Sequence, residues 1–382
     1  MSGAVEKALA ALTDGFYRPT EFPALAHQMR AWRAARPLAG RRVLDGTPIF
    51  RNTILKYRAL LAAGAELTVS GTALMPRDPA ICAALREAGV RVLLDAVPEN
   101  EIFDVVLDCG AAHRAVPSRY GYAELTRTGV HRYRERAQEA AVFAADSGRI
   151  KAIETCLGTG DGFLRALRQL GYGGVAGKKA VVFGFGKVGR GIVFYLTRAG
   201  ARVCAADFPA VLQTLPAGVT ALDIADRAAL ERVLSEADIV VTATGHRDAL
   251  AELTDTRKLA ESRALLANMG VEDEYGPAVP ENRVLNGKKP LNFILAEPTR
   301  PGYIETTMAL HNAGALELLN HDGGAGMLIP DSALEEALLR ISCEEGEAGD
   351  EIAALLRELK KQPAHTDAGT APCGRRNDGK GS

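Results

Sequence analysis

The sequence predicts an α/β protein with two doubly wound parallel sheets and a helical C-terminal segment. Short apolar runs alternate with amphipathic helical stretches, glycine-rich turns separate them, and 382 residues are more than one core usually holds. Parallel strands need a crossover segment between them. Apolar runs that are each followed by a helical stretch therefore favour parallel over antiparallel pairing.

In the first part of the chain, expected helices alternate with expected strands. We expect helices over 4–12, 22–32, 52–63 and 78–88 and strands over 42–45, 64–71, 90–96 and 104–110. The stretch 131–145 has amphipathic helical spacing, and a helix is expected over about 160–170. These elements predict a first parallel sheet within about the first 140 residues.

The second part repeats the pattern after the glycine-rich segment 171–179. We expect strands over 180–184, 201–207, 238–245 and 264–270 and helices over 188–199, 227–236 and 255–261. Three more helices are expected over 303–319, 331–340 and 349–361. The small, polar stretch from 363 to 382 is predicted to be a disordered tail.

Composition and charge exclude several classes of protein. The net charge is −1, from 46 basic and 47 acidic residues, so we expect a small-molecule substrate and neither nucleic acid nor a membrane as partner. No apolar run approaches the length of about 20 residues that spans a bilayer, and the N-terminus does not resemble a signal peptide. Six cysteines without CxxC spacing predict reduced thiols, no metal site and a cytoplasmic location.

The glycines of the motif GFGKVG, residues 184–189, predict a phosphate-binding turn between a strand and a helix. Gly184 permits the tight turn, Gly186 lets the backbone approach a pyrophosphate, and Gly189 lets the helix pack close to the strand. The free N–H groups and the positive end of the helix favour an anion there. This context is typical of a Rossmann-like dinucleotide site, and Lys187 and Val188 are predicted to border it.

Asp207 identifies the dinucleotide. It ends the next expected strand, 23 residues after Gly184, close to the spacing of about 20 that is usual for the ribose-binding acid. A carboxylate there accepts hydrogen bonds from ribose hydroxyls and repels a 2′-phosphate. We therefore predict NAD, and not NADP, as the cofactor.

Two further strand ends are candidates for cofactor contacts. Thr242, Thr244 and Gly245 close one expected strand, and Asn268 and Gly270 close the next. Ligands of open α/β sheets lie beyond the carboxyl ends of the strands. The alternative is that these small polar residues are ordinary turn residues.

These motifs resemble those of a known family, the adenosylhomocysteinases (S-adenosylhomocysteine hydrolases). GFGKVGRG is similar to the family's GYGDVGKG loop, with Lys187 in place of the acid, VTATG to its VTTTG, and NMG to its NIG. The segments 121–133 and 291–314 are also similar, and the likeness covers about residues 15–320. It implies that Thr126, Thr128 and Asn292 contact NAD and that the protein is a homo-oligomer.

The resemblance also implies a division into domains. Residues 1–160 would be the substrate or catalytic domain, and 161–300 the NAD-binding Rossmann domain. The helices of 301–362 would return to the substrate domain.

The family oxidises the 3′-hydroxyl of a nucleoside ribose with resident NAD, eliminates a group at C5′, adds water and reduces the ketone again. Several of its catalytic positions differ in this chain. The family's histidine falls at about Pro48, one aspartate at Cys109 and a glutamate at Leu125. The resemblance therefore implies a divergent member with altered catalytic residues.

Three residues are candidates for the remaining chemistry. Lys151 and Glu154 lie three residues apart, which places them on one face of a helix. A lysine beside NAD could have a lowered pKa and act as a base that Glu154 orients, and the alternative is a solvated ion pair. Cys109 follows an expected strand and is either a thiol in the pocket or a packed small residue.

Three functions remain open at this point. The first is an enzyme that uses bound NAD+ to oxidise a secondary alcohol transiently, followed by elimination, hydration or dehydration on a nucleoside-like substrate. The second is a net NAD-dependent dehydrogenase of a small hydroxy or amino acid. The third is a non-catalytic, NAD-binding regulatory homologue.

Overall fold

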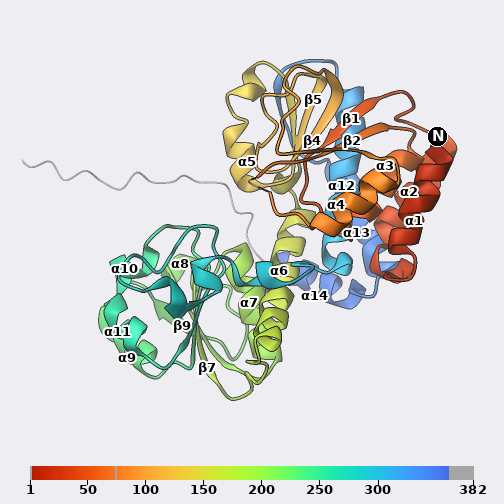
Figure 1. Cartoon of the computed structure of the whole chain (residues 1–382). Helices are drawn as coiled ribbons and strands as arrows, with labels where there is room; N and C mark the ends of the chain where they lie inside the picture. The colour runs from red at the N-terminus through yellow and green to blue at the C-terminus, as the bar shows by residue number, and fades with distance from the viewer. Residues whose placement is uncertain (1, 74, 361–382) are drawn as a thin grey trace, which may run out of the picture.

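The computed structural model describes residues 2–73 and 75–360, and the prediction of a disordered tail lies outside them (Figure 1). Two lobes, each built around one parallel sheet, are joined by the long helix α6 (Arg149–Gln169). No helix among the described residues is long and apolar enough to cross a membrane.

The first lobe contains seven strands in the order β13-β6-β5-β4-β1-β2-β3, and all neighbours are parallel. These strands are β1 (Arg42–Asp45), β2 (Glu66–Gly71), β3 (Arg91–Leu94), β4 (Phe103–Asp108), β5 (Ser118–Glu124), β6 (Ala141–Ala144) and β13 (Gly326–Leu328). Its helices are α1 (Ser2–Thr13), α2 (Pro23–Ala35), α3 (Thr53–Ala62), α4 (Pro79–Glu87) and α5 (Arg127–Arg132).

The second lobe contains six parallel strands in the order β12-β11-β10-β7-β8-β9. These are β7 (Lys179–Phe183), β8 (Arg202–Asp207), β9 (Thr220–Asp223), β10 (Ile239–Thr242), β11 (Leu265–Asn268) and β12 (Val284–Leu285). The helices are α7 (Lys187–Arg198), α8 (Pro209–Leu212), α9 (Arg227–Ser235), α10 (Ala249–Leu253) and α11 (Thr256–Glu261).

Both sheets are wound in the same way. Counted from the first strand of each lobe, the first six strands follow the spatial order 3-2-1-4-5-6, which is that of a Rossmann sheet. The predicted fold class is therefore confirmed. The strand order reverses between β1 and β4 in the first lobe and between β7 and β10 in the second, and such switch points are where doubly wound sheets bind ligands.

The C-terminal segment returns to the first lobe. Helix α12 (Pro301–Asn320) packs on α2, α3 and β5, and α13 (Ser332–Glu345) packs on α12 and α2. Gly314 brings α12 close to the sheet, because a Cβ there would lie 2.6 Å from the Phe143 ring. Helix α14 (Gly349–Lys360) follows and contacts α13 and α6.

The prediction of one helical stretch over 131–145 was wrong. The chain forms α5, a 3-10 turn at Arg136–Gln138, strand β6 and a second 3-10 turn at Ala145–Ser147. All four residues of β6 are buried between β5 and β13. A short apolar run that is buried on both faces has no alternation that distinguishes a strand from a buried helix.

Helix α6 begins eleven residues earlier than its predicted start at 160. It therefore runs through the predicted boundary between the domains at residue 160. The domain limits drawn from the sequence stay a prediction.

Candidate functional site

The turn after β7 needs glycine at two positions for steric reasons. Gly184 has a φ of +88°, and a Cβ there would lie 2.5 Å from the Ala243 carbonyl oxygen. At Gly189 a Cβ would lie 1.8 Å from the Gly184 carbonyl oxygen. Helix α7 therefore packs directly on the turn from which it starts.

Gly186 differs from these two glycines, because a Cβ there would meet no atom within 4 Å. It is the N-cap of α7, so the free N–H groups of Lys187 and Val188 follow it at the start of the helix. Crowding at Gly184 and Gly189 together with open space at Gly186 is the steric pattern that a pyrophosphate-binding turn requires. The residues present therefore fit a dinucleotide.

Asp207 is held beside this turn at the end of β8. Its Oδ2 accepts a hydrogen bond from the Phe185 N–H at 2.7 Å, and its Oδ1 accepts one from the Phe208 N–H at 2.7 Å. A carboxylate has about four acceptor sites, so two remain for ribose hydroxyls. Arg190, which was not predicted from the sequence, lies over the Phe185 ring at 4.3 Å and donates to Thr214 Oγ1.

The predicted cofactor residues at the next two strand ends are engaged by the protein itself. Glu274 accepts hydrogen bonds from the N–H groups of Thr244 (2.8 Å) and Gly245 (2.7 Å), and burial raises the pKa of Glu274. Thr242 Oγ1 donates to Asn268 Oδ1 at 2.9 Å, and both side chains are fully buried. These residues shape the strand ends, and their contact with NAD stays a prediction.

Asn268 Oδ1 also accepts a hydrogen bond from the Gly270 N–H at 3.0 Å. Glu274 was not predicted from the sequence. Its position six residues after Asn268 does not indicate that it contacts Thr244 and Gly245. That contact forms because the loop after β11 folds back toward the end of β10.

The three other residues for which the resemblance implied a contact with NAD are found in separate places. Thr126 caps α5, and its hydroxyl donates to Glu124 at 2.7 Å while accepting the Gly129 N–H at 3.1 Å. Thr128 is exposed on α5. Asn292 is buried against α6. A Cβ added to Gly162 of this helix would lie 3.1 Å from the Cβ of Asn292.

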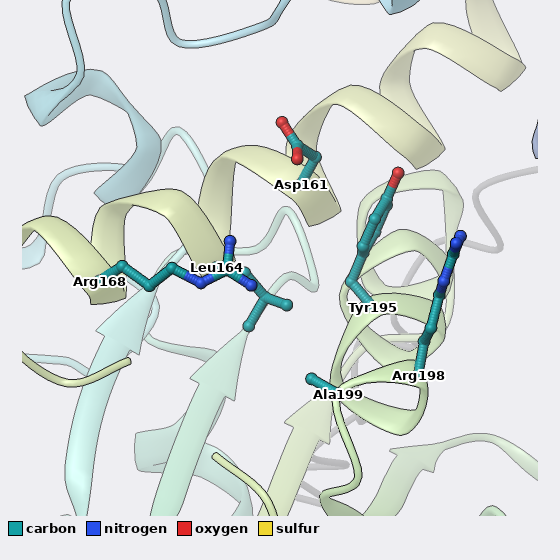
Figure 2. Close-up of a pocket in the computed structure, with 6 residues that line it drawn as sticks. All are labelled: Asp161, Leu164, Arg168, Tyr195, Arg198 and Ala199. Carbon is teal, nitrogen blue, oxygen red and sulfur yellow. The ribbon is translucent and has the colours of Figure 1, made fainter. Parts of the chain in front are cut away.

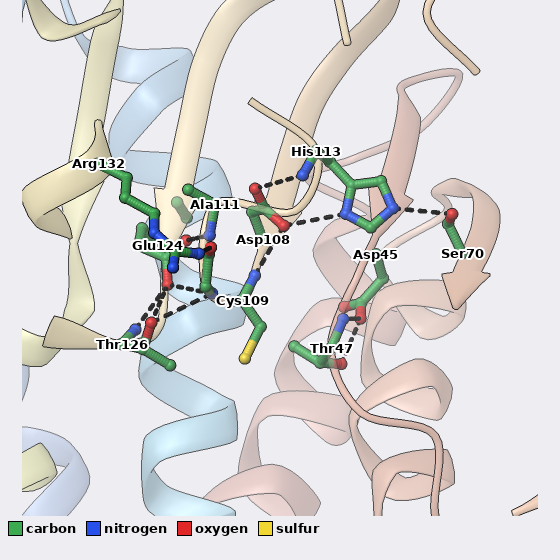
Figure 3. A network of polar contacts seen from close by, with 12 residues as sticks. Asp45, Thr47, Ser70, Asp108, Cys109, Ala111, His113, Glu124, Thr126 and Arg132 are labelled. Atoms are coloured by element: carbon green, nitrogen blue, oxygen red, sulfur yellow. Dashed lines mark hydrogen bonds and ion pairs between the residues drawn. The ribbon is translucent and has the colours of Figure 1, made fainter. Parts of the chain in front are cut away.

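The switch point of the first lobe is filled by a buried histidine (Figure 3). His113 Nδ1 lies 2.9 Å from Asp108 Oδ1 at the end of β4, and His113 Nε2 lies 2.8 Å from Ser70 Oγ at the end of β2. The imidazole therefore crosses over the end of β1, where a Cβ on Gly46 would lie 2.3 Å from His113 Nδ1. Tyr133 donates to Asp108 Oδ2 at 2.7 Å and completes the network.

Glu124 organises the loop beside this network. It accepts the N–H groups of Gly110 and Ala111 at 2.9 Å each. Burial and the nearby Asp108 carboxylate raise the pKa of Glu124 to about 7. Glu124 therefore anchors the loop that follows β4.

Lys151 and Glu154 form a nearly buried ion pair on α6, with Nζ 2.5 Å from Oε2. Thr307 Oγ1 of α12 lies 3.4 Å from the same carboxylate oxygen. Burial by itself would lower the pKa of Lys151, but the charges of Glu154 and Asp146 outweigh it, and the pKa lies above its ordinary value. The direction is therefore opposite to the one that a lysine base requires, and a catalytic role for Lys151 and Glu154 stays a prediction.

Cys109 lies at the end of β4 and is almost fully buried. Burial and the carboxylates of Glu124 and Asp108 raise the pKa of its thiol. It is therefore a neutral thiol at neutral pH and not a nucleophilic thiolate. A catalytic role for Cys109 stays a prediction.

The structure adds two buried groups that were not predicted from the sequence. Lys56 of α3 forms an ion pair with Asp45 at the end of β1, and both side chains are buried. His311 of α12 lies with Nε2 2.8 Å from the Ala123 carbonyl oxygen. Burial and the charge of Lys56 lower the pKa of His311 to about 3, so the ring is neutral. A lysine inside the apolar run 54–62 is the one sequence signal that could have indicated the pair.

A cavity of about 270 Å³ lies between α6 and α7, away from these groups (Figure 2). It is lined by Asp161, Leu164, Arg168, Tyr195, Arg198 and Ala199. Ala199 follows the last residue of α7, whereas Gly186 precedes the first, so a helix of 12 residues, about 18 Å long, separates this cavity from the glycine turn. It is not the cofactor site.

The fold and the glycine turn define a dinucleotide-binding α/β protein. Residues 158–276 match the family model of the S-adenosyl-L-homocysteine hydrolase NAD binding domain. This part of the chain is therefore similar to the NAD-binding domain of the adenosylhomocysteinases, and NAD is the cofactor of this domain.

The relatives are similar over only part of their length. An adenosylhomocysteinase of Archaeoglobus fulgidus is 30% identical over 271 residues, which are 63% of this chain and 64% of that protein. The chain thus spans a little less than two thirds of that relative. An S-inosyl-L-homocysteine hydrolase of Methanopyrus kandleri is 28% identical over 72% of this chain and 73% of that protein.

Among solved structures, a dipicolinate synthase of Bacillus halodurans is similar over 74% of this chain and 99% of its own length. Its identity is 14% and its TM-score 0.47, so this likeness carries no argument about function.

Proposed function

We propose that this protein is an NAD-dependent enzyme that oxidises a secondary alcohol of a nucleoside-like substrate transiently and then catalyses elimination, hydration or dehydration. The observation that carries the proposal is the nearly buried Lys151–Glu154 pair at the start of α6, with Thr307 beside it. A solvated ion pair would lie on an exposed face, and this one does not. The names of the two relatives, both hydrolases of nucleoside thioethers, support the substrate class.

NAD+, when bound, supplies a reversible acceptor for the hydride of a secondary alcohol, and the ketone that results acidifies the neighbouring C–H bond. Gly184, Gly186 and Gly189 would hold its pyrophosphate, and Asp207 its adenosine ribose.

The ion pair would divide the proton chemistry between its two members. Glu154 accepts the proton of the substrate hydroxyl, since it is the carboxylate of the pair. Lys151 stays protonated, because Glu154 and Asp146 raise its pKa, and its ammonium stabilises negative charge on the substrate oxygen. Thr307 orients the carboxylate through its hydroxyl.

Two measurements on the purified protein test this function. First, the protein is denatured and the released nucleotide assayed, and we expect close to one NAD per chain. Second, the holoprotein is incubated in D₂O with S-adenosyl-L-homocysteine or S-inosyl-L-homocysteine. We expect deuterium at the carbon next to the oxidised position, without net NADH formation.

Glu154→Gln is expected to slow this exchange by about 100-fold or more, as the loss of a proton acceptor does. Glu236→Gln, in an exposed ion pair with Lys179, is the matched control and should exchange at the unmodified rate. Continuous NADH release with a hydroxy or amino acid would replace the proposal by net dehydrogenation. A holoprotein that exchanges no deuterium with either thioether and reduces no NAD would favour the regulatory homologue.

A further inference from the structure

One ion pair connects the cofactor turn directly to the other lobe. Lys187 is the first residue of α7, and its Nζ lies 3.6 Å from Asp146 Oδ2 and 3.4 Å from the Asp146 carbonyl oxygen. Asp146 belongs to the 3-10 turn Ala145–Ser147 that follows β6. Because α7 follows β7 and this turn follows β6, the carboxyl edges of the two sheets face each other at this contact.

The Lys187–Asp146 ion pair is partly exposed to solvent, and the hydrogen-bond donors of its ammonium are not all used. The Lys187 side chain is 39% exposed and that of Asp146 13%. Both contacts are at or beyond the long end of hydrogen-bond distances, and a lysine has three donor hydrogens. The ammonium therefore has donors left for another anion.

A second anion is expected next to this ammonium. Lys187 directly follows Gly186, the position in the turn with no atom within 4 Å of a Cβ. Pyrophosphate binds at such a helix N-terminus, so its oxygens would come close to the first side chain of α7. The adenosylhomocysteinase loop has an acidic residue at this position, and an acidic side chain cannot bind an anion in this way.

We propose that Lys187 bridges Asp146 and the pyrophosphate of bound NAD, so that the pair is a gate that slows cofactor release. Asp146 is then a positioning residue, which acts on the cofactor only through Lys187. NAD is released when the Lys187 ammonium breaks its contact with Asp146 or with the phosphate. The inference rests on NAD occupying the glycine turn and does not depend on the reaction proposed above.

The test is the rate at which the full-length protein, loaded with the fluorescent analogue etheno-NAD, releases it into an excess of NAD. Lys187→Ala is expected to release the analogue about 10- to 50-fold faster and Asp146→Asn about 5- to 10-fold faster, as for a partly exposed charge pair on a ligand. The double variant should be no faster than Lys187→Ala, because the two residues act as one unit.

Lys179→Ala is the matched control. It removes an exposed ion pair with Glu236 at the amino edge of the same sheet, and the release rate should stay unchanged. The melting temperature of each apo variant should also stay unchanged, which separates the gate from a general loss of folding.

Three results would overturn the gate. The first is an Asp146→Asn variant that releases the analogue at the unmodified rate. The second is an additive double variant. The third is a charge swap, Lys187→Asp with Asp146→Lys, that restores slow release, since the swap rebuilds the contact between the lobes but places an acid at the pyrophosphate. If the gate fails while Gly186→Asp still abolishes NAD binding, the cofactor turn and the proposed function stand without it.

Discussion

The two lobes share one strand order, but they differ in how much space is left beside the turn that follows their first strand. In the second lobe, Gly186 faces space with no atom within 4 Å of a Cβ. In the first lobe, Gly46 directly follows β1, and a Cβ there would lie 2.3 Å from His113 Nδ1. With the same strand order, the turn after the first strand is thus open at Gly186 in one lobe and occupied by an imidazole beside Gly46 in the other.

The loops behind the fourth strand are, by contrast, held alike in both lobes. Glu124 accepts the backbone N–H groups of Gly110 and Ala111 after β4, and Glu274 accepts those of Thr244 and Gly245 after β10. The fold therefore sets how the loops are anchored. The two lobes differ in the side chains at their switch points, so function has to be inferred from the site and not from the topology.

The largest effect that we expect from this comparison is on stability in the first lobe. Gly46→Ala should lower the free energy of unfolding by about 2–4 kcal/mol, because the new methyl group overlaps the His113 ring. In a His113→Ala background the same substitution should cost less than about 1 kcal/mol. Equilibrium unfolding in urea measures both. Equal costs in the two backgrounds would show that His113 does not occupy the space beside Gly46.

A smaller effect is expected from pH. Burial raises the pKa of Glu305 in α12 to about 7, although the Leu25 N–H and the Ser342 hydroxyl donate to it. Glu124 has a raised pKa of about 7 as well. Such a carboxyl binds its proton more tightly in the folded protein than in the unfolded chain. Its stabilising contribution is therefore present below about pH 4.5 and is lost as the pH rises to about 7.

We expect the free energy of unfolding to fall by about 1–3 kcal/mol between pH 5 and pH 7.5 from Glu305 alone. Glu305→Gln keeps an acceptor for Leu25 and cannot ionise, so its slope should be shallower. Urea unfolding at both pH values gives the result. A variant with the unmodified slope would contradict a titrating Glu305 in the first lobe.

In the second lobe, Asp207→Ala should weaken NAD binding about tenfold, the usual loss for hydrogen bonds from a charged acceptor. It should also reduce the preference for NAD over NADP, because the carboxylate that repels a 2′-phosphate is removed. Calorimetric titration with each nucleotide measures both affinities. Unaltered affinity and preference would mean that another residue selects the cofactor.

The sequence predicts the strands that are both buried and bounded by turns. β7, β8, β10 and β11 are found within three residues of their predicted limits, since each is an apolar run that stops at a glycine or a polar residue. Five strands were not predicted: β5, β6, β9, β12 and β13. The last three lie at edges of their sheets, and edge strands of two to four residues lack a long apolar run. β5 and β6 are interior strands, so their omission has a different cause.

The site also contains residues that the sequence predicts and residues that it does not. The glycine turn and Asp207 are adjacent elements of one βαβ unit, so their spacing is visible in the sequence. The bridge from Asp108 through His113 to Ser70 joins residues up to 43 positions apart, and it forms because β1 lies between β4 and β2. Single-sequence patterns do not give strand order. The same holds for the pKa of Lys151, which depends on burial and on charges that only the folded chain brings together.

The most direct test of the account is a titration of NAD into the protein and into Gly186→Asp. Because nothing lies within 4 Å of the new Cβ, the variant should fold and melt as before, while its carboxylate faces the pyrophosphate. We predict that NAD affinity falls by about 100-fold or more. A Gly186→Asp protein that binds NAD as tightly as the unmodified chain would place the cofactor elsewhere and contradict the account.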